Sequence, residues 1–513
     1  MKKILALILA LVLTLALTAC GGSGDEGGEG DAAKDTLTVV ISNDIGTLDP
    51  HDNTTFPHHQ VTRQIYETLV IRDGNGDLAP CLAESWEYED DVTILFHLRH
   101  GVLFHNGEEL KASDVIFTLH RMVEDNTTGS MQVSHIVLDK CEAVDDYTVR
   151  VVTDEPSAMQ LSMLENPLAC IISEKAYKES NGDFFQAPIG TGPYKFVSYD
   201  AGDRVVPEAN ENYWIEGEPH VPNVVFRIIT DSSSRAIEAE SGNADIVYDI
   251  GANDVDRVGS NPNVNLVTGL GMNTSYVTFN TAKAPLDDIR VREAIWYAID
   301  LDSIVKIAYG NFGATADGVV SPGVEGRHSD LSSYFPTRDV EKAKALLAEA
   351  GYADGLTLRM TAPNSDQQRM DFCEAMQAQL NEVGITLDLD YKEYNAWISE
   401  ITNGSAELGV YGFTASTGEA GRVLMRWMPD YSESVIFSWY DDEYIAKCSE
   451  AMRTIDGNAR NALFAECQEL LMESYCALPV WHKAVNAALQ PDIQGFSLMT
   501  SYEQHYLQHV YFG

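Results

Sequence analysis

Positive charge is scarce in this sequence of 513 residues. It has 34 lysines and arginines against 78 aspartates and glutamates, which gives a formal net charge of −44 at pH 7. A surface this acidic repels phosphate backbones and anionic headgroups, so nucleic acid is excluded as an expected partner. The composition indicates an acidic extracellular protein, and its length predicts two or three lobes, because one hydrophobic core does not grow to this size.

Cysteine is also sparse, and its spacing excludes two common uses. Seven cysteines remain after Cys20; they are odd in number, widely scattered and contain no C-x-x-C pair. This pattern predicts neither a disulfide framework nor a thiolate metal site. We expect most of these cysteines to be small buried hydrophobic residues.

Motifs of hydrolytic chemistry are missing as well, since the sequence contains neither G-x-S-x-G nor H-E-x-x-H. Its paired acids are adjacent in the chain, which keeps them from facing each other as a general acid and base. We therefore predict a non-catalytic protein with no cofactor and no metal site. Nickel remains an alternative, and its candidate ligands would be the histidine pairs His58-His59 and His505-His509.

The only long apolar run lies at the start of the chain. Lys2 and Lys3 precede an apolar stretch over residues 4–17, too short for a convincing membrane span, which ends in Leu-Thr-Ala-Cys20. This resembles a lipoprotein signal with its lipobox. The resemblance implies cleavage before Cys20 and a diacylglycerol on its sulfur, so that the mature protein is anchored at the extracellular face of the membrane, or is periplasmic. Residues 21–35 are Gly-rich and acidic and predict a flexible linker.

Near the middle of the chain, the pattern of residues 277–302 predicts a strand followed by a helix. The sequence of this segment is VTFNTAKAPLDDIRVREAIWYAIDLD. Further strings are AESW at 83–86, FHLRHGVLFHNG at 96–107, ASDVIFTLHR at 112–121 and GTGPYKF at 190–196. In this order they resemble the bacterial extracellular solute-binding proteins of family 5, the peptide and nickel binders of ABC importers. The Gly-rich string is not a phosphate loop, because no G-K-[ST] follows and Pro193 removes a donor N–H.

The resemblance implies an α/β fold of the periplasmic-binding-protein type (type II, cluster C), with two α/β lobes, an inserted extra domain and a hinge cleft. We assign residues 36–50, 185–275 and 481–513 to lobe I, 51–184 to the inserted domain and 276–480 to lobe II. Within lobe II, strands at 356–360 and 385–389 flank a helix at 367–383, which predicts a parallel β-α-β unit. Residues 63–71 read as a helix.

Substrate choice is expected to depend on the loop after a strand at residues 408–413, because loops at the carboxyl ends of strands face the crevice of open α/β sheets. In peptide-binding members this loop carries an acid that accepts the ligand's α-ammonium, and Glu419 matches it by type but not by length. The alternative is that Glu419 is an exposed loop acid. The predicted ligand residues are Thr417, Gly418, Glu419, Phe413, Tyr394, Trp397 and Arg369, the three aromatic ones being equally compatible with core packing. Arg359 is a second candidate for a ligand carboxylate.

These patterns predict a monomeric binding protein that captures a peptide or an amine-bearing solute, closes on it by hinge motion and is recognised by an ABC permease with its ATPase. Two alternatives stay open. One is a binder of nickel or of another small solute of the same family. The other is a receptor that captures a peptide pheromone for signalling instead of uptake.

Overall fold

The computed structural model describes residues 34–73, 77–310, 312–498 and 506–513. Cys20 and His505, on which the lipid anchor and one histidine pair depend, lie outside these residues. Residues 36–513 form one compact unit. None of the helices in the described part of the chain has both the length and the apolar character needed to cross a bilayer.

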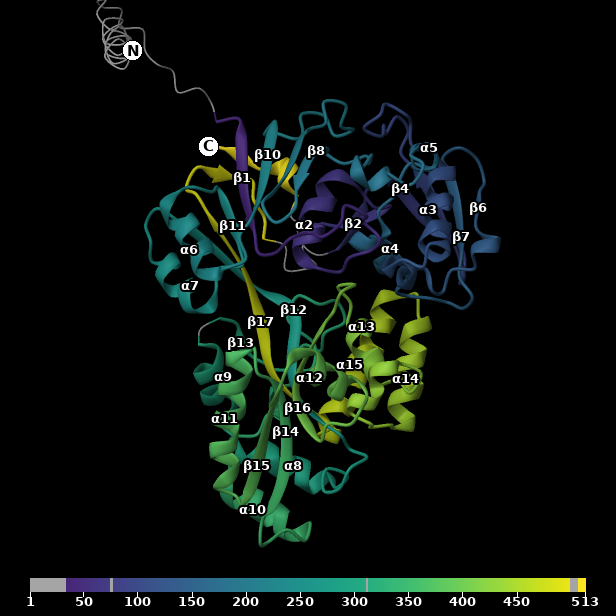
Figure 1. The fold of residues 1–513 in the computed structure, drawn as a ribbon. Helices are drawn as coiled ribbons and strands as arrows, with labels where there is room; N and C mark the ends of the chain where they lie inside the picture. Colours follow the sequence, from purple (N-terminus) through teal and green to yellow (C-terminus); the bar gives the residue numbers. More distant parts are fainter. Residues whose placement is uncertain (1–33, 74–76, 311, 499–505) are drawn as a thin grey trace, which may run out of the picture. The chain divides into compact units, whose positions relative to one another are not determined.

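One large mixed sheet of 11 strands organises this unit (Figure 1). In spatial order the strands are β15 (Ile385–Lys392), β14 (Leu356–Pro363), β16 (Leu408–Thr414), β12 (Asn265–Phe279), β17 (Ala477–Leu489), β11 (Ile246–Tyr248), β1 (Thr36–Ile41), β10 (Asn223–Ile228), β9 (Arg204–Ala209) and β8 (Tyr194–Asp200), with β13 (Ala314–Thr315) paired to β17. The long strands β12 and β17 join the lobe II strands β14 to β16 to the lobe I strands β1 and β8 to β11. They pair antiparallel with each other from Asn265 to Thr278.

The inserted domain has a separate four-stranded sheet, whose strands in order are β4 (Ala83–Asp90), β5 (Thr93–Leu98), β7 (Thr148–Val152) and β6 (Glu142–Ala143). Two short pairs complete the strands, β2 (Val70–Arg72) with β3 (Leu78–Pro80) and β18 (Ile493–Gln494) with β19 (Tyr511–Phe512). The fold is therefore the predicted mixed α/β fold.

Helices cover these sheets. Those of residues 51–264 are α2 (Phe56–Ile65), α3 (Ala112–Glu124), α4 (Gln160–Glu165), α5 (Glu174–Glu179), α6 (Ser232–Ser241) and α7 (Ala252–Gly259). Those of lobe II are α8 (Ile289–Ala298), α9 (Leu301–Tyr309), α10 (Val340–Glu349), α11 (Gln367–Asn381), α12 (Tyr394–Thr402), α13 (Gly421–Leu424), α14 (Asp442–Arg453) and α15 (Gly457–Ser474). Asp288 caps α8, because its side chain accepts a hydrogen bond from the backbone N–H of Arg290.

Two local predictions have clear outcomes. The parallel β-α-β unit is confirmed, since β14 and β15 run parallel from the pair Leu356 and Ile385 onwards. The helix predicted over residues 63–71 is wrong beyond Ile65. There Tyr66 adopts an extended conformation and the chain continues into β2, whose Val-Ile sequence favours a strand.

Four hydrophobic clusters form the core. The largest lies within residues 272–481, and a second joins β1, β10 and β11 to α2 and to residues 170–184. A third fills the inserted domain between residues 69 and 171, and a small fourth lies beneath α6 and α7. The boundaries of the three lobes stay a prediction.

Candidate functional site

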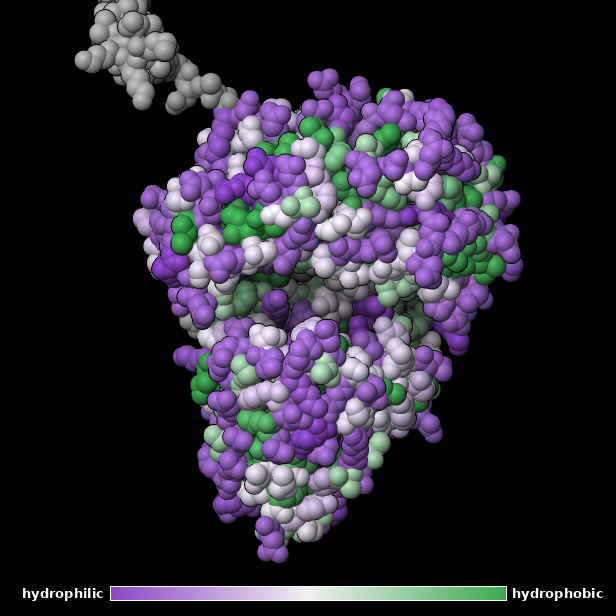
Figure 2. Space-filling view, viewed as in Figure 1, coloured by the Kyte–Doolittle hydropathy of each residue, from purple (hydrophilic) through white to green (hydrophobic). Residues whose placement is uncertain are grey.

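A cleft of about 550 Å³ opens where β12 and β17 pass between the lobe I and lobe II strands. In Figure 2 the surface is hollowed at this level. The lining residues come from lobe I, from Phe56 at the start of α2, from both long strands and from lobe II. They are Ser42, Asn43, Phe56, Thr230, Arg235, Asp249, Ile250, Gly251, Ala252, Gly271, Met272, Asn273, Ser275, Tyr309, Phe312, Asp366, Arg369, Thr414, Trp481, Lys483, Ala484 and Val485.

An irregularity in the pairing of β12 with β17 positions the cleft. Regular pairing stops after Leu270 and resumes at Thr274, so the three residues Gly271, Met272 and Asn273 are left to line the cleft. Such bulges bend a strand and turn its side chains away from the ladder. The opposite segment of β17 supplies Trp481 and Lys483 to the same space.

Stacked aromatic rings form one wall of the cleft. The rings of Tyr309 and Trp481 lie 4.1 Å apart at an interplanar angle of 6°. The indole Nε1 of Trp481 donates a hydrogen bond to the Phe312 carbonyl oxygen at 3.0 Å, which fixes the ring. Because both rings are nearly buried, this wall is rigid and offers an apolar surface to a ligand.

Two of the three basic residues that line the cleft have charge to offer a ligand. Lys483 is exposed, and within the described residues its ammonium group has no hydrogen-bond or ion-pair partner. Arg369 lies on α11, forms an ion pair with Asp366 at 3.3 Å, and places its guanidinium 5.0 Å above the Trp397 ring. Arg235 is instead structural, because its nitrogens donate to the carbonyl oxygens of residues 229, 230 and 249.

The cleft also contains two carboxylates, Asp366 and Asp249. Asp366 caps α11 by accepting a hydrogen bond from the backbone N–H of Arg369, so one of its carboxylate oxygens is already engaged. Asp249 follows β11 in lobe I, and its carboxylate receives no hydrogen bond from the part of the chain that the structure describes. The cleft therefore carries both signs of charge.

The loop that follows β16 runs from the cleft to a buried seam against the inserted domain. Thr414 lines the cleft, whereas residues 416–419 are held by the inserted domain. Arg72 donates to the Thr417 carbonyl oxygen at 2.5 Å, and the Asn166 amide donates to the Ser416 carbonyl oxygen at 3.2 Å. A Cβ built on Gly418, whose φ is +71°, would lie 2.6 Å from the Arg72 guanidinium, so glycine is needed there.

Glu419 is buried in this seam rather than exposed. Its Oε1 accepts a hydrogen bond from the Ser162 hydroxyl and lies 3.9 Å from an Arg72 nitrogen, and its Oε2 lies 3.8 Å from Nε of Arg460. Burial raises the pKa of Glu419, although Arg460 and Ser162 lower it in part. Within the described residues neither Glu419 Oε2 nor the Thr417 hydroxyl has a hydrogen-bond partner.

The predicted aromatic residues lie in and above the lobe II core. Phe413 and Trp397 are buried there, with Phe413 against Trp427 and Phe437. Tyr394 is half exposed, with its ring 5.4 Å from that of Trp397. Of the seven predicted ligand residues, Arg369 alone is among the described residues that line the cleft, and the roles of the seven stay predictions. Arg359 pairs with Asp390 and Glu400 on the sheet.

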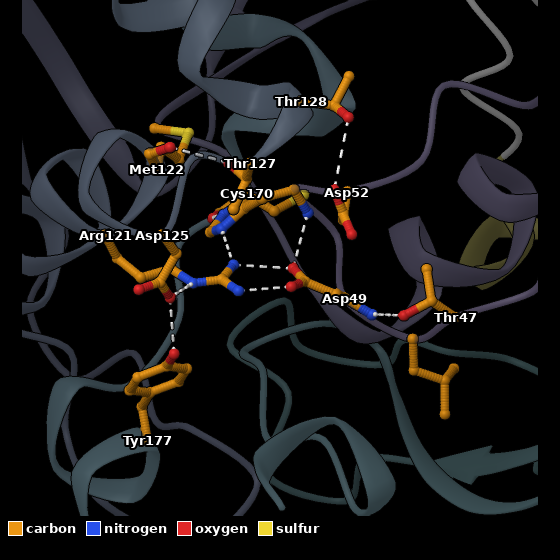
Figure 3. A network of polar contacts seen from close by, with 12 residues as sticks. Thr47, Asp49, Asp52, Arg121, Met122, Asp125, Thr127, Thr128, Cys170 and Tyr177 are labelled. Atoms are coloured by element: carbon orange, nitrogen blue, oxygen red, sulfur yellow. Dashed lines mark hydrogen bonds and ion pairs between the residues drawn. The ribbon is translucent and has the colours of Figure 1, made fainter. Parts of the chain in front are cut away.

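A separate polar network joins the loop after β1 to α3 (Figure 3). Arg121 donates to both carboxylate oxygens of Asp49, at 2.8 and 2.5 Å, and to Nδ1 of His51 at 2.6 Å. Since Nδ1 accepts, His51 is neutral and donates from Nε2 to the Cys170 carbonyl oxygen at 2.7 Å. Burial lowers the pKa of His51 to about 4. This network ties the two segments together.

Of the two histidines on α2, His58 makes a structural contact. His58 is buried and bonds to the Asp49 carbonyl oxygen at 3.0 Å, and burial lowers its pKa to about 4. The described residues contain no group of three or more His, Cys, Asp or Glu side chains placed to hold a metal ion.

Residues 77–434 match the family of bacterial extracellular solute-binding proteins, family 5 Middle. The chain belongs to this family. The glutathione-binding protein GsiB of Salmonella paratyphi A is 28% identical over 481 residues, which cover 91% of this chain and 93% of the relative. Heme-binding protein A of Haemophilus influenzae is 29% identical over 469 residues, which cover 85% and 84%.

A solved structure extends the likeness to the fold of this family 5 protein. The ABC transporter-associated periplasmic binding protein DppA from Helicobacter pylori, in complex with the peptide STSA, superposes with a TM-score of 0.75 at 25% identity. The match covers 93% of this chain and 98% of that one. The predicted family and fold are therefore confirmed, and the chain is a solute-binding protein of the kind that serves ABC importers.

Several cleft residues of this family 5 protein escaped prediction from the sequence. Trp481 and Lys483 lie on a strand that looks like any buried strand, and Asp249 follows a strand of three residues. They meet only because β12 and β17 cross between the lobes and break their pairing there. The local sign of a cleft in the sequence is that Trp481 and Lys483 are two residues apart, which places them on one face of a strand.

Proposed function

We propose that this protein captures a short peptide, or another solute that carries both an ammonium group and a carboxylate, and delivers it to an ABC permease. One observation carries the proposal. The loop over residues 414–419 links a cleft with available cations to two buried oxygen atoms, Thr417 Oγ1 and Glu419 Oε2, that have no hydrogen bond within the described residues, although Arg460 Nε lies 3.8 Å from Glu419 Oε2. A zwitterionic ligand satisfies both ends.

The ligand carboxylate is assigned to Lys483 and Arg369. Lys483 contributes an ammonium group without an ion-pair partner among the described residues, and Arg369 keeps guanidinium N–H groups beyond its single contact to Asp366. A charge pair about 4 Å apart gains on the order of 4 kcal/mol before desolvation at an effective dielectric near 20. The aromatic wall of Tyr309 and Trp481 would take an apolar side chain of the ligand.

The ligand ammonium is assigned to Glu419 with Thr417. Glu419 Oε2 is a buried carboxylate oxygen without a hydrogen bond in the described chain, which is costly unless a donor arrives. The chain from Thr414 to Glu419 spans at most about 18 Å, so an extended peptide of about five residues is long enough to bridge cleft and loop. Asp249, in the cleft itself, is the rival acid.

Closure of the cleft would transmit the ligand's presence to the permease. The lining comes from lobe I, which supplies Asp249, and from lobe II, which supplies Arg369, so a bound ligand contacts both. Contacts in both lobes favour the closed state, and the two long strands β12 and β17 are the natural hinge. We further propose that a lipid on Cys20 holds the monomeric protein at the extracellular face of the membrane.

Native mass spectrometry of the purified protein tests the proposal, with Glu419→Gln and Asp249→Asn measured beside the wild type. A co-purified peptide that is lost from the Glu419 variant and kept in the Asp249 variant supports the assignment. If the carried molecule is a sugar, a haem or a metal, or if no short peptide binds when a pool is added, the peptide assignment is wrong while family membership stands.

A further inference from the structure

A second pocket, of about 380 Å³, lies in the seam between the inserted domain and lobe II and is lined by thioethers. Its methionines are Met159, Met163, Met425, Met428 and Met452. The whole chain has only 14 methionines, so this concentration does not follow from composition. Apart from these five, the apolar lining consists of Pro156 and Tyr431, with no Leu, Ile, Val or Phe. A pocket selected only for apolar surface would mix these residue types.

Spacing along the chain groups these methionines on common faces. Met159 and Met163 are four residues apart at the start of α4, which places them on one helix face. Met425 and Met428 are three residues apart around the 3₁₀ turn η6 (Met425–Trp427), where side chains at that spacing align. Met452 lies in the last turn of α14.

Gly421 fixes how closely two of these sulfurs approach. A Cβ built on Gly421 would lie 2.8 Å from Sδ of Met159 and 3.1 Å from Sδ of Met452, so both sulfurs border the same small space. Gly421 begins the short helix α13 with no positive φ, so the backbone does not require glycine there. What requires glycine is room for the two thioethers and for the Phe464 ring, whose Cζ would also lie 2.8 Å from that Cβ.

The rim of the pocket joins its two sides and carries both signs of charge. The Ala158 N–H donates to the Met452 carbonyl oxygen at 3.0 Å, and Arg453 forms an ion pair with Glu155 at 2.6 Å. Of the other basic side chains, His135 lies 3.2 Å from Asp154, and Arg422 donates to Sδ of Met425 at 3.5 Å. Asp430 adds a further negative charge at the rim.

We propose that this thioether pocket binds one soft monovalent cation of the Cu(I) and Ag(I) class. Thioether sulfur is a soft, polarisable ligand that selects Cu(I) over Mg²⁺, Ca²⁺ or Zn²⁺, which prefer oxygen, imidazole or thiolate. Met159 and Met452 are the central ligands, with Met163 and Met428 in the same pocket to complete the coordination. Met425 is left out of this set, because its sulfur accepts a hydrogen bond from the Arg422 guanidinium at 3.5 Å. The ion would thereby link the inserted domain to lobe II.

Ag(I), which needs no reducing agent, is the probe. The full chain is first alkylated, because Cys141 is the only cysteine among the described residues that is not buried, and is then titrated with Ag(I) by calorimetry and examined by X-ray absorption. We expect one tightly bound Ag(I) per chain in a sulfur-only shell that excess Zn(II) does not displace.

Matched variants locate the ion. Met159→Leu with Met452→Leu should weaken Ag(I) binding at least about tenfold, and Met131→Leu, an exposed methionine outside the pocket, should leave it unchanged. Leucine has a similar volume, so the fold should persist, and Met452→Leu alone decides if the double variant fails to fold. Absence of Ag(I) from the alkylated protein, displacement by Zn(II), or equal affinity in the Leu variants would overturn the proposal.

Discussion

Replacing Glu419 by glutamine separates a ligand-binding role of this residue from a structural one. Glutamine keeps the size of the side chain and an oxygen to accept from Ser162, but removes the charge. If Glu419 accepts a ligand ammonium group, the lost hydrogen bond to a charged group costs about 1.5 to 3 kcal/mol, which is roughly a 10- to 150-fold loss of affinity.

The stability of the variant should change in the opposite sense. Burial raises the pKa of Glu419 in the folded protein, so folding favours its neutral form. The stability that this form contributes is fully present below the pKa of the unfolded chain and is lost as pH rises through the folded pKa. Glutamine is neutral at every pH, so we expect Glu419→Gln to be at least as stable as the wild type near pH 7. The two proteins should converge below the ordinary glutamate pKa of 4.5.

Calorimetric titration with the peptide that co-purifies, and urea unfolding at several pH values, measure the two effects on the same samples. Asp249→Asn is the matched control, because it removes one acid from the cleft and leaves the buried seam intact. Unchanged affinity in Glu419→Gln, with affinity lost in Asp249→Asn, would refute the assignment of the ammonium group. A large drop in stability at pH 7 would refute the electrostatic reasoning about the seam.

Three further predictions concern the cleft and the core. Lys483→Gln should lower peptide affinity by about tenfold without changing the melting temperature, because Lys483 is exposed, and calorimetry checks this. Arg121→Ala should cost about 3 to 5 kcal/mol in urea unfolding, because it strands the buried Asp49 carboxylate. Burial raises the pKa of Asp49, but the hydrogen bonds and charge of Arg121 outweigh it and hold this pKa below its ordinary value of 3.8. The stability from this pair is therefore present above that value and is lost as pH falls. Gly190→Ala should abolish soluble expression, because its Cβ would lie 2.0 Å from the Ile65 carbonyl oxygen.

Local patterns in the sequence predict much of this fold. The strand predicted over residues 408–413 is β16, which ends one residue later, and the parallel pair β14 and β15 follows from the β-α-β order. These features depend on neighbours in the chain. The helix predicted over residues 63–71 ends at Ile65 in the structure. Residues 66–72 are compatible with a helix or a strand by pattern alone, and the pairing of β2 with β3 decides for the strand.

The candidate site was less predictable because its contacts span hundreds of residues. Family resemblance pointed to Glu419, but no local pattern indicates that Ser162 and Arg72 of the inserted domain enclose it. The exposed loop acid that was the alternative is excluded by this burial. Trp481 and Lys483 reach the cleft through a break in strand pairing that sequence periodicity does not encode.

The two oxygen atoms of Glu419 suggest how ligand binding and domain contact cooperate. Oε1 accepts a hydrogen bond from Ser162 of the inserted domain, while Oε2 has no hydrogen bond in the described residues and lies 3.8 Å from Nε of Arg460. A ligand ammonium at Oε2 would therefore add to the inserted domain's hold on the loop, not displace it. Because coupling between two binding events is reciprocal, a variant that loosens the seam, such as Ser162→Ala, should also lower the affinity for the ligand. By the same reasoning, a tightly bound ligand should protect the amides of residues 416–419 from hydrogen exchange more than those of the rest of lobe II.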